Sequence, residues 1–138
     1  MTTLPSRIVL FPAVLAAGLF AAMVAMPANA IEADIVMMQG LDKITARTRT
    51  FEVPIGASRD FGSLEITART CHKTPPEEPP ERRAFLEIVD VRPDRDAVTV
   101  FSGWMFASSP ALNALEHPVY DVWVVDCKVT DANAETAD

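Results

Sequence analysis

Short stretches in which apolar and polar residues alternate run through most of the chain after residue 30. Leu64, Ile66 and Ala68 alternate with polar residues at a period of two, which is typical of a strand with one buried face. Prolines, glycines and polar residues separate further β-prone stretches, at 35–43, 48–55, 85–91, 97–106 and 119–127. We therefore predict an all-β fold: a small antiparallel barrel or sandwich of about six strands, in which 35–43 and 48–55 form a hairpin.

One of these stretches, 97–106, carries apolar residues that need a cover. Residues 97–106 are apolar in both phases, which predicts burial on two sides. The following residues, 108–117, predict a short helix in which Ser109 caps the N-terminus, Pro110 takes the first position and Pro118 comes after the end. We expect this helix to cover the outer face of 97–106.

Residues 74–81 read Thr-Pro-Pro-Glu-Glu-Pro-Pro-Glu and cannot join a sheet, because prolines lack the backbone donor. This composition predicts a stiff, acidic, exposed loop in a polyproline-like conformation. A preformed loop loses little entropy when it binds a partner, so the loop is a candidate contact segment. The alternative is that the loop only connects two strands and is kept stiff and soluble by its composition. The candidate contact residues are Pro75, Pro76, Glu77, Glu78, Pro79 and Pro80.

The beginning of the chain has the pattern of a secretory signal. Arg7 precedes the apolar residues 8–26, and Ala28-Asn29-Ala30 is a small-x-small site for a signal peptidase. The alternative is an uncleaved membrane anchor, since the stretch is close to the length that spans a bilayer. Cleavage is favoured because Pro12 and Gly18 interrupt the stretch and no basic stop-transfer residues follow it.

This pattern divides the chain into three parts. We predict a cleavable signal peptide at 1–30, a single β domain at 31–128 and a disordered acidic tail at 129–138. The expected location is the periplasm, with no integral membrane segment after cleavage. The formal net charge of −7 becomes one unit more negative when Arg7 is removed. An acidic chain without a basic patch repels phosphates, so nucleic acid binding is not expected.

Two cysteines, Cys71 and Cys127, are present, and in an oxidising compartment they should pair. Cross-linking a loop of this length stabilises a fold by about 4 kcal/mol on the chain-entropy model. Cys71 falls on the polar phase of its strand, so we expect a strand end or bulge that turns its sulfur inward. A metal site built from both cysteines, His72 and His117 is the alternative, but it lacks a closely spaced ligand pair. We expect no metal and no cofactor.

Candidate catalytic residues are few. Ser108 or Ser109, His117 and Asp121 supply a nucleophile, a base and a carboxylate within one segment. No Gly-x-Ser-x-Gly elbow is present, Ser109 suits a helix cap, and His117 suits a helix end. A glycosidase needs two carboxylates across a cleft, and the spacing of such pairs cannot be read from the sequence. Its candidates are Glu52, Glu65, Glu87 and Asp121.

Aromatic residues gather in the last third of the chain. They supply either core packing or a groove for a glycan or peptide, and their period of two favours the core. In 119–127, Trp123, Val125 and Cys127 share one phase. We retain Trp104 as a candidate partner contact. The aromatic residues considered for the core or a groove are Phe101, Trp104, Phe106, Tyr120 and Trp123.

Several blocks together resemble a known family, the domain of unknown function 2155, which consists of small secreted proteins of Gram-negative bacteria. The blocks are Phe-Gly-Ser-Leu-Glu-Ile at 61–66, the proline-rich 71–81, 85–88, 101–110 and 117–123. The resemblance covers about residues 41–128 and implies a periplasmic or envelope location, but no activity, cofactor or site. We therefore expect a secreted, non-enzymatic domain that contacts an envelope protein or a glycan. A hydrolase of envelope polymers is the alternative.

Overall fold

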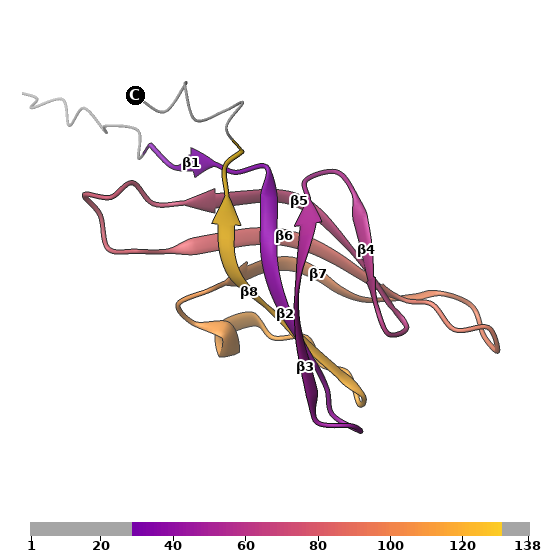
Figure 1. The fold of residues 1–138 in the computed structure, drawn as a ribbon. Helices are drawn as coiled ribbons and strands as arrows, with labels where there is room; N and C mark the ends of the chain where they lie inside the picture. The colour runs from indigo at the N-terminus through magenta and orange to yellow at the C-terminus, as the bar shows by residue number, and fades with distance from the viewer. Residues whose placement is uncertain (1–28, 131–138) are drawn as a thin grey trace, which may run out of the picture.

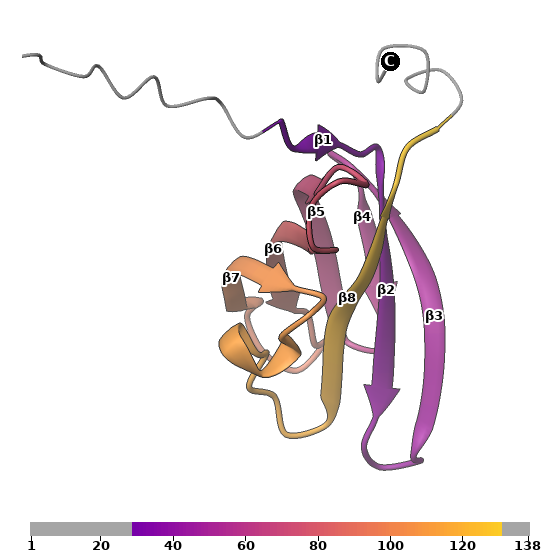
Figure 2. The ribbon, with the colours of Figure 1, turned by 90° about the vertical axis from the view of Figure 1, so that its left-hand side faces the viewer.

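The computed structural model describes residues 29–130, which form two antiparallel β-sheets packed face to face (Figures 1 and 2). The larger sheet has the order β1-β5-β6-β7, with β4 also paired to β5, and the smaller sheet has the order β3-β2-β8. The predicted all-β fold is confirmed, as a sandwich rather than a closed barrel. The strands are β1 (Ile31–Glu32), β2 (Ile35–Asp42), β3 (Arg47–Pro54), β4 (Ser58–Phe61), β5 (Leu64–Lys73), β6 (Arg82–Asp90), β7 (Val98–Phe106) and β8 (Tyr120–Lys128).

The strands of the smaller sheet run across those of the larger sheet (Figure 1). The predicted alternation is confirmed in β5, where Leu64, Ile66 and Ala68 are fully buried while Glu65 is exposed. The other strands contribute their inward phase in the same way, so the core lies between the two sheets. Its largest fully buried side chains include Met38, Leu64, Ile66, Leu86, Ile88, Val36, Val53, Val122 and Val124.

Two β-bulges turn the cysteines into this core. The register of β5 against β6 shifts between Ala68 and Thr70, which confirms the bulge predicted before Cys71. A second shift, in β8 opposite Met37 and Met38, leaves Val125 without a register partner. This shift turns Cys127 to the same buried face as Val124. The prediction that Trp123, Val125 and Cys127 share one face is therefore wrong. A bulge adds one residue and reverses every side chain after it.

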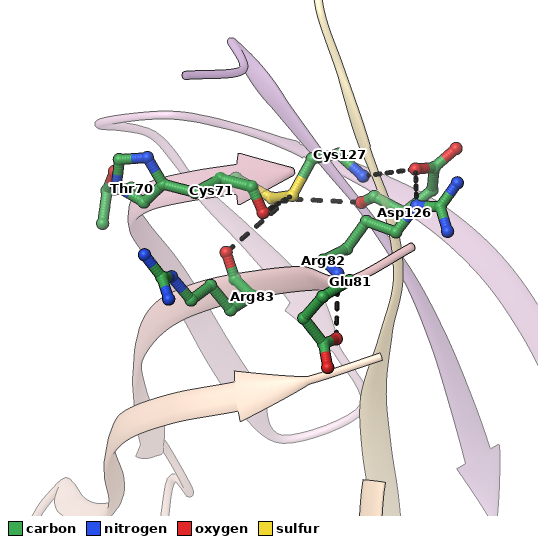
Figure 3. The surroundings of a disulfide bond; sticks show 8 residues. Thr70, Cys71, Glu81, Arg82, Arg83, Asp126 and Cys127 are labelled. Atoms are coloured by element: carbon green, nitrogen blue, oxygen red, sulfur yellow. Dashed lines mark hydrogen bonds and ion pairs between the residues drawn. A yellow bond between two sulfur atoms is a disulfide. The ribbon is translucent and has the colours of Figure 1, made fainter. Parts of the chain in front are cut away.

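The predicted disulfide is confirmed. It joins Cys71 of β5 to Cys127 of β8, with their Cα atoms 5.8 Å apart, and so it links the two sheets (Figure 3). Because the two sulfur atoms bond to each other, the alternative metal site loses both of its thiolates.

The predicted helix over 108–117 is a single 3-10 turn, η1 (Pro110–Asn113), with Pro110 at its start. The Ser109 side chain makes no capping hydrogen bond, so its predicted role as a cap is wrong. Asn113 donates to the backbone oxygen of Trp104 (2.8 Å) and lies next to Gly103, which is in the inward phase of β7. The turn therefore flanks the edge of β7 and leaves the outer face uncovered. Four residues make only one turn, and none of them is buried.

The domain boundaries were predicted at residues 30 and 128. Val129 packs against the core, and both the backbone and the hydroxyl of Thr130 donate to Asp34 at 2.9 Å. The described fold thus extends two residues past the predicted boundary. The predicted signal peptide, up to residue 28, and the rest of the tail lie outside the described residues. Within the described part of the chain, no helix has the length and hydropathy needed to cross a membrane.

Candidate functional site

The proline-rich loop between β5 and β6 is closed by its own hydrogen bonds. The backbone N–H of Thr74 donates to Glu81 O (3.0 Å), and the Thr74 hydroxyl donates to Pro79 O (2.9 Å) and accepts from Glu81 N (3.0 Å). Glu78 N donates to Pro75 O at 3.1 Å, so the chain reverses in a turn here, whereas its composition predicted a polyproline-like conformation. The predicted exposure is confirmed for residues 76–80.

The C-terminal root of this loop is fixed to neighbouring strands. The Glu81 carboxylate accepts hydrogen bonds from Arg82 N (2.9 Å), Ser108 N (3.3 Å) and the Ser108 hydroxyl. Burial raises the pKa of Glu81, but these hydrogen bonds outweigh it, so the pKa is below its usual value. Arg82 Nε also pairs with Asp126 Oδ1 (3.0 Å), beside the disulfide (Figure 3). The loop therefore projects from a rigid base.

Beside this loop, the outer face of the larger sheet carries a cluster that we call the aromatic face. The ring centroid of Trp104 lies 5.5 Å from that of Phe85 and 6.0 Å from that of His72, and Arg83 Cζ lies 5.8 Å from the Trp104 centroid. Their strands pair so that these side chains share one face, and all remain at least partly exposed. The aromatic face consists of His72, Arg83, Phe85, Trp104 and Phe106.

The structure thus brings the candidate contact residues together. His72 lies two residues before Thr74, so the aromatic face begins at the root of the proline loop. Trp104 comes from β7, some 25 residues further along the chain than the loop, and strand pairing places it beside Phe85 and near His72, the residue of the aromatic face that is nearest to the loop in sequence. Within the described residues, Nδ1 of His72 is buried without a hydrogen-bond partner. The sequence motif of the loop gave no sign of this neighbour.

The remaining aromatic residues divide between core and surface. Phe101 is buried in the core, as predicted. Trp123 pairs in register with Gln39 and lies on the outer face of the smaller sheet. The bulge at Val125 comes after Trp123 and therefore does not change its side. Tyr120 stacks on His117 with a centroid distance of 5.4 Å. The two tryptophans therefore stand on opposite outer faces of the sandwich.

The residues proposed for a hydrolase do not assemble. His117 is 6% exposed, and its Nδ1 accepts from Val119 N and Tyr120 N, both at 3.1 Å. Nε2 therefore carries the proton and donates to Asp90 Oδ2 at 3.3 Å. The carboxylate partner of His117 is Asp90 and not Asp121. Asp121 lies in β8, in register with Leu41 of β2. Ser108 is bonded to Glu81 instead of to an imidazole.

Asp90 is the centre of a buried polar cluster that sequence reasoning missed. It is 4% exposed and accepts from Ser63 Oγ (2.6 Å), Arg92 Nε (3.0 Å), Arg95 Nη2 (3.1 Å) and His117. The hydrogen bond from Ser63, followed by those from His117 and Arg92, holds the pKa of Asp90 well below its usual range. The sequence signal that could have indicated this cluster is a strand that ends in Asp90 and is followed by two arginines, Arg92 and Arg95.

The hydrogen bonds of this cluster join Asp90 to neighbouring segments and do not form a catalytic triad. The serine hydroxyl donates to the carboxylate, whereas nucleophilic catalysis needs a serine that donates to the imidazole. Two of the glycosidase candidates are held in ion pairs: Glu87 pairs with Arg69 at 2.7 Å, and Glu52 pairs with Lys128. Glu87 lies on the larger sheet and Glu52 on the smaller one.

Comparison with known proteins gives a family and no activity. A family model described as "Uncharacterized protein conserved in bacteria", domain of unknown function 2155, matches residues 36–127. The chain is 31% identical over 87 residues to "Uncharacterized protein RP359" of Rickettsia prowazekii (strain Madrid E), over 63% of this chain and 56% of that protein. The chain thus spans about half the length of this relative. No solved structure matches the chain significantly. Since the family model covers nearly the whole described fold, the chain belongs to the domain of unknown function 2155 family.

Proposed function

We propose that this chain is an exported, non-enzymatic binding domain that contacts another component of the bacterial envelope through the proline loop and the aromatic face. The observation that carries the proposal is the side-by-side position of a closed, projecting loop and a partly exposed Trp104 cluster. Aromatic and arginine side chains are enriched in protein interfaces. A loop that is already closed by hydrogen bonds loses little entropy when it binds.

Two further observations support a binding role outside the cytoplasm. Both ring nitrogens of His117 are engaged by backbone and by Asp90, so this histidine has no free nitrogen to act as a base. The disulfide between Cys71 and Cys127 suits an oxidising compartment. Together with the signal pattern at 1–30, this supports export to the periplasm.

The experiment is mild crosslinking of envelopes that contain the C-terminally tagged full chain, followed by purification and identification of bound proteins. One test variant replaces Pro76, Pro79 and Pro80 by serine, and the other is Trp104→Ala. The matched control is Trp123→Ala, because Trp123 lies on the outer face of the smaller sheet. Thermal denaturation and closure of the disulfide verify the fold of each variant.

We expect one reproducible partner that both test variants lose and Trp123→Ala retains. Equal loss with all three variants, or recovery of the tagged chain alone, would contradict the proposal. In the second case, glycan arrays and hydrolysis assays on envelope polymers address the remaining alternatives. Intact mass of the purified chain shows in the same experiment whether residues 1–30 have been removed.

A further inference from the structure

The β2–β3 hairpin projects past the larger sheet, at the bottom of the view in Figure 1, and the β4–β5 turn lies at the other end of β5 from the proline loop. Between this overhang and the β4–β5 turn lies an open cavity of about 480 Å³. Such a volume is in the range of ligand-binding sites, and the walls here are a mixture of charged and aromatic side chains. Its lining includes Asp42, Arg47, Thr48, Arg49, Phe61 and Tyr120.

The aromatic wall of the cavity is rigid. Phe61 stacks on Phe51 at 5.4 Å and meets Tyr120 edge-on at 5.7 Å. Two glycines make room for these rings: a Cβ on Gly40 would lie 2.5 Å from the Phe61 ring, and one on Gly62 would lie 2.2 Å from Tyr120. Gly62 also has a φ of +59°, which favours glycine. The wall therefore keeps its shape without a ligand.

Two arginines give the cavity a positive charge in a chain whose net charge is −7. Arg49 Cζ lies 5.2 Å from the Phe61 centroid, so this guanidinium is held against the wall. Asp42 accepts hydrogen bonds from Ile44 N (2.9 Å) and Thr45 N (3.2 Å), and its carboxylate is thereby committed to the hairpin turn. Arg47 lies opposite Asp42 in the β2–β3 register, and after the hydrogen bond from Thr45 N its charge helps to lower the pKa of that carboxyl. Arg49 Nη2 donates to Asp60 O at 3.3 Å. Within residues 29–130, neither arginine has a carboxylate at ion-pair distance, so both guanidinium groups keep donors for an anion.

Among residues 29–130, the same hairpin presents a sheet edge without a partner strand, because β3 ends the order β3-β2-β8. Ile55 N donates to Asp34 O at 2.8 Å, and this bond sets the alternation of the antiparallel ladder. By that alternation, Thr48, Thr50 and Glu52 direct their backbone N–H and C=O groups away from β2. Pro54 falls in the same set, which is where a strand tolerates a missing donor. Thr48 and Thr50 are exposed.

We propose that this edge and cavity bind an extended acidic peptide segment of a partner, which adds a strand to β3 and directs carboxylates at alternate positions toward Arg47 and Arg49. The two arginines are two residues apart and so share one face of β3. Residues i and i+2 of an added strand would lie opposite them on that face. Backbone pairing with β3 supplies affinity, and charge-assisted bonds to guanidinium supply selectivity.

An added strand explains the two features together. A small anion in the cavity would use the arginines but leave the backbone groups of Thr48 and Thr50 to water. The rest of the acidic surface repels an acidic segment, so binding is confined to this basic edge. The site is separate from the proline loop and the aromatic face, and its success or failure is independent of the function proposed for them.

The test is fluorescence anisotropy of labelled peptides with the purified, exported chain at two salt concentrations. The probe is acetyl-Val-Glu-Val-Glu-Val-Thr, compared with a peptide in which both Glu are Gln and with one in which the two Glu are adjacent. Arg47→Gln should weaken binding about ten-fold or more, since it removes a charge-assisted bond. Thr50→Pro, which removes an edge donor and keeps the β2–β3 ladder, should also weaken it. Arg69→Gln is the charge-matched control, because Arg69 pairs with Glu87 on the larger sheet.

Each result either supports or overturns the proposal. Preference for alternating glutamates, lost with Arg47→Gln and kept with Arg69→Gln, supports it. Equal binding of the alternating and adjacent peptides, or equal weakening by both arginine variants, reduces the effect to general electrostatics and overturns it. Competition by succinate alone, with no effect of Thr50→Pro, would identify a small-anion site instead. If Thr50→Pro lowers the melting temperature strongly, hydrogen exchange of the Thr50 amide replaces it: protection on peptide binding is expected, and absence of protection overturns the added strand.

Discussion

Replacement of Asp90 by Asn tests whether the buried polar cluster holds the end of β6 to the β4–β5 turn and to the segment before β8. Asn keeps the shape of the side chain but removes the charge that Arg92, Arg95 and His117 approach at 3.0–3.3 Å. Breaking a buried charged network typically costs about 3–5 kcal/mol. Arg92 is 30% and Arg95 is 53% exposed, so both guanidinium groups regain water when the carboxylate is lost. We therefore expect a smaller loss of unfolding free energy, about 2–3 kcal/mol.

This loss should be easy to measure. For a domain of this size, it corresponds to a fall in melting temperature of about 10–20 °C. Urea unfolding at pH 7, with the disulfide intact, gives the free energy directly. The matched control is Asp96→Asn, which removes an exposed carboxylate from the turn that follows β6. A cost for Asp90→Asn no larger than that of the control would refute the reasoning.

The pH dependence of the unfolding free energy provides an independent check that ionised Asp90 stabilises the fold. The pKa of Asp90 is lowered in the folded state, chiefly by the Ser63 hydroxyl, so the unfolded chain takes up the proton first on acidification. The stability that ionised Asp90 contributes is fully present above the unfolded pKa of about 4 and declines as the pH falls toward the folded pKa. The difference between wild type and Asp90→Asn should therefore stay constant from pH 7 to about pH 5 and shrink below about pH 4.

Three further changes test other parts of the fold. Replacing Cys71 and Cys127 by Ala should lower the unfolding free energy by up to about 4 kcal/mol in urea, and an unchanged midpoint would contradict the role of the link between the sheets. Gly62→Ala should cost about 1–3 kcal/mol more than Gly56→Ala, because both have positive φ but only Gly62 abuts Tyr120; equal melting temperatures would show that the ring yields. Thr74→Val should cost about 1 kcal/mol and speed cleavage of the proline loop by proteases, and an unchanged cleavage rate would show that its hydroxyl does not close the loop.

The strand at 64–73 and the bulge before Cys71 illustrate how far the sequence could be interpreted. A period of two arises when one face of a strand is buried, and a cysteine on the wrong phase requires an extra residue before it. In β8 the same logic failed, because Val122, Val124 and Val125 are apolar in both phases and hide the shift at Val125. The short helix was predicted from local signals and is present as η1, but its position beside β7 depends on the edge of the sheet.

The sequence by itself determined the β class, the approximate strands, the pairing of the only two cysteines and the exposure of the proline loop, because each depends on local period, composition or a count. The tertiary structure decided what those elements meet. Asp90 and His117 are 27 residues apart, Trp104 lies far from the proline loop in sequence, and Arg49 and Phe61 come from different sheets. These contacts arise from strand register and the crossing of two sheets, which are non-local and leave no periodic signal in the chain.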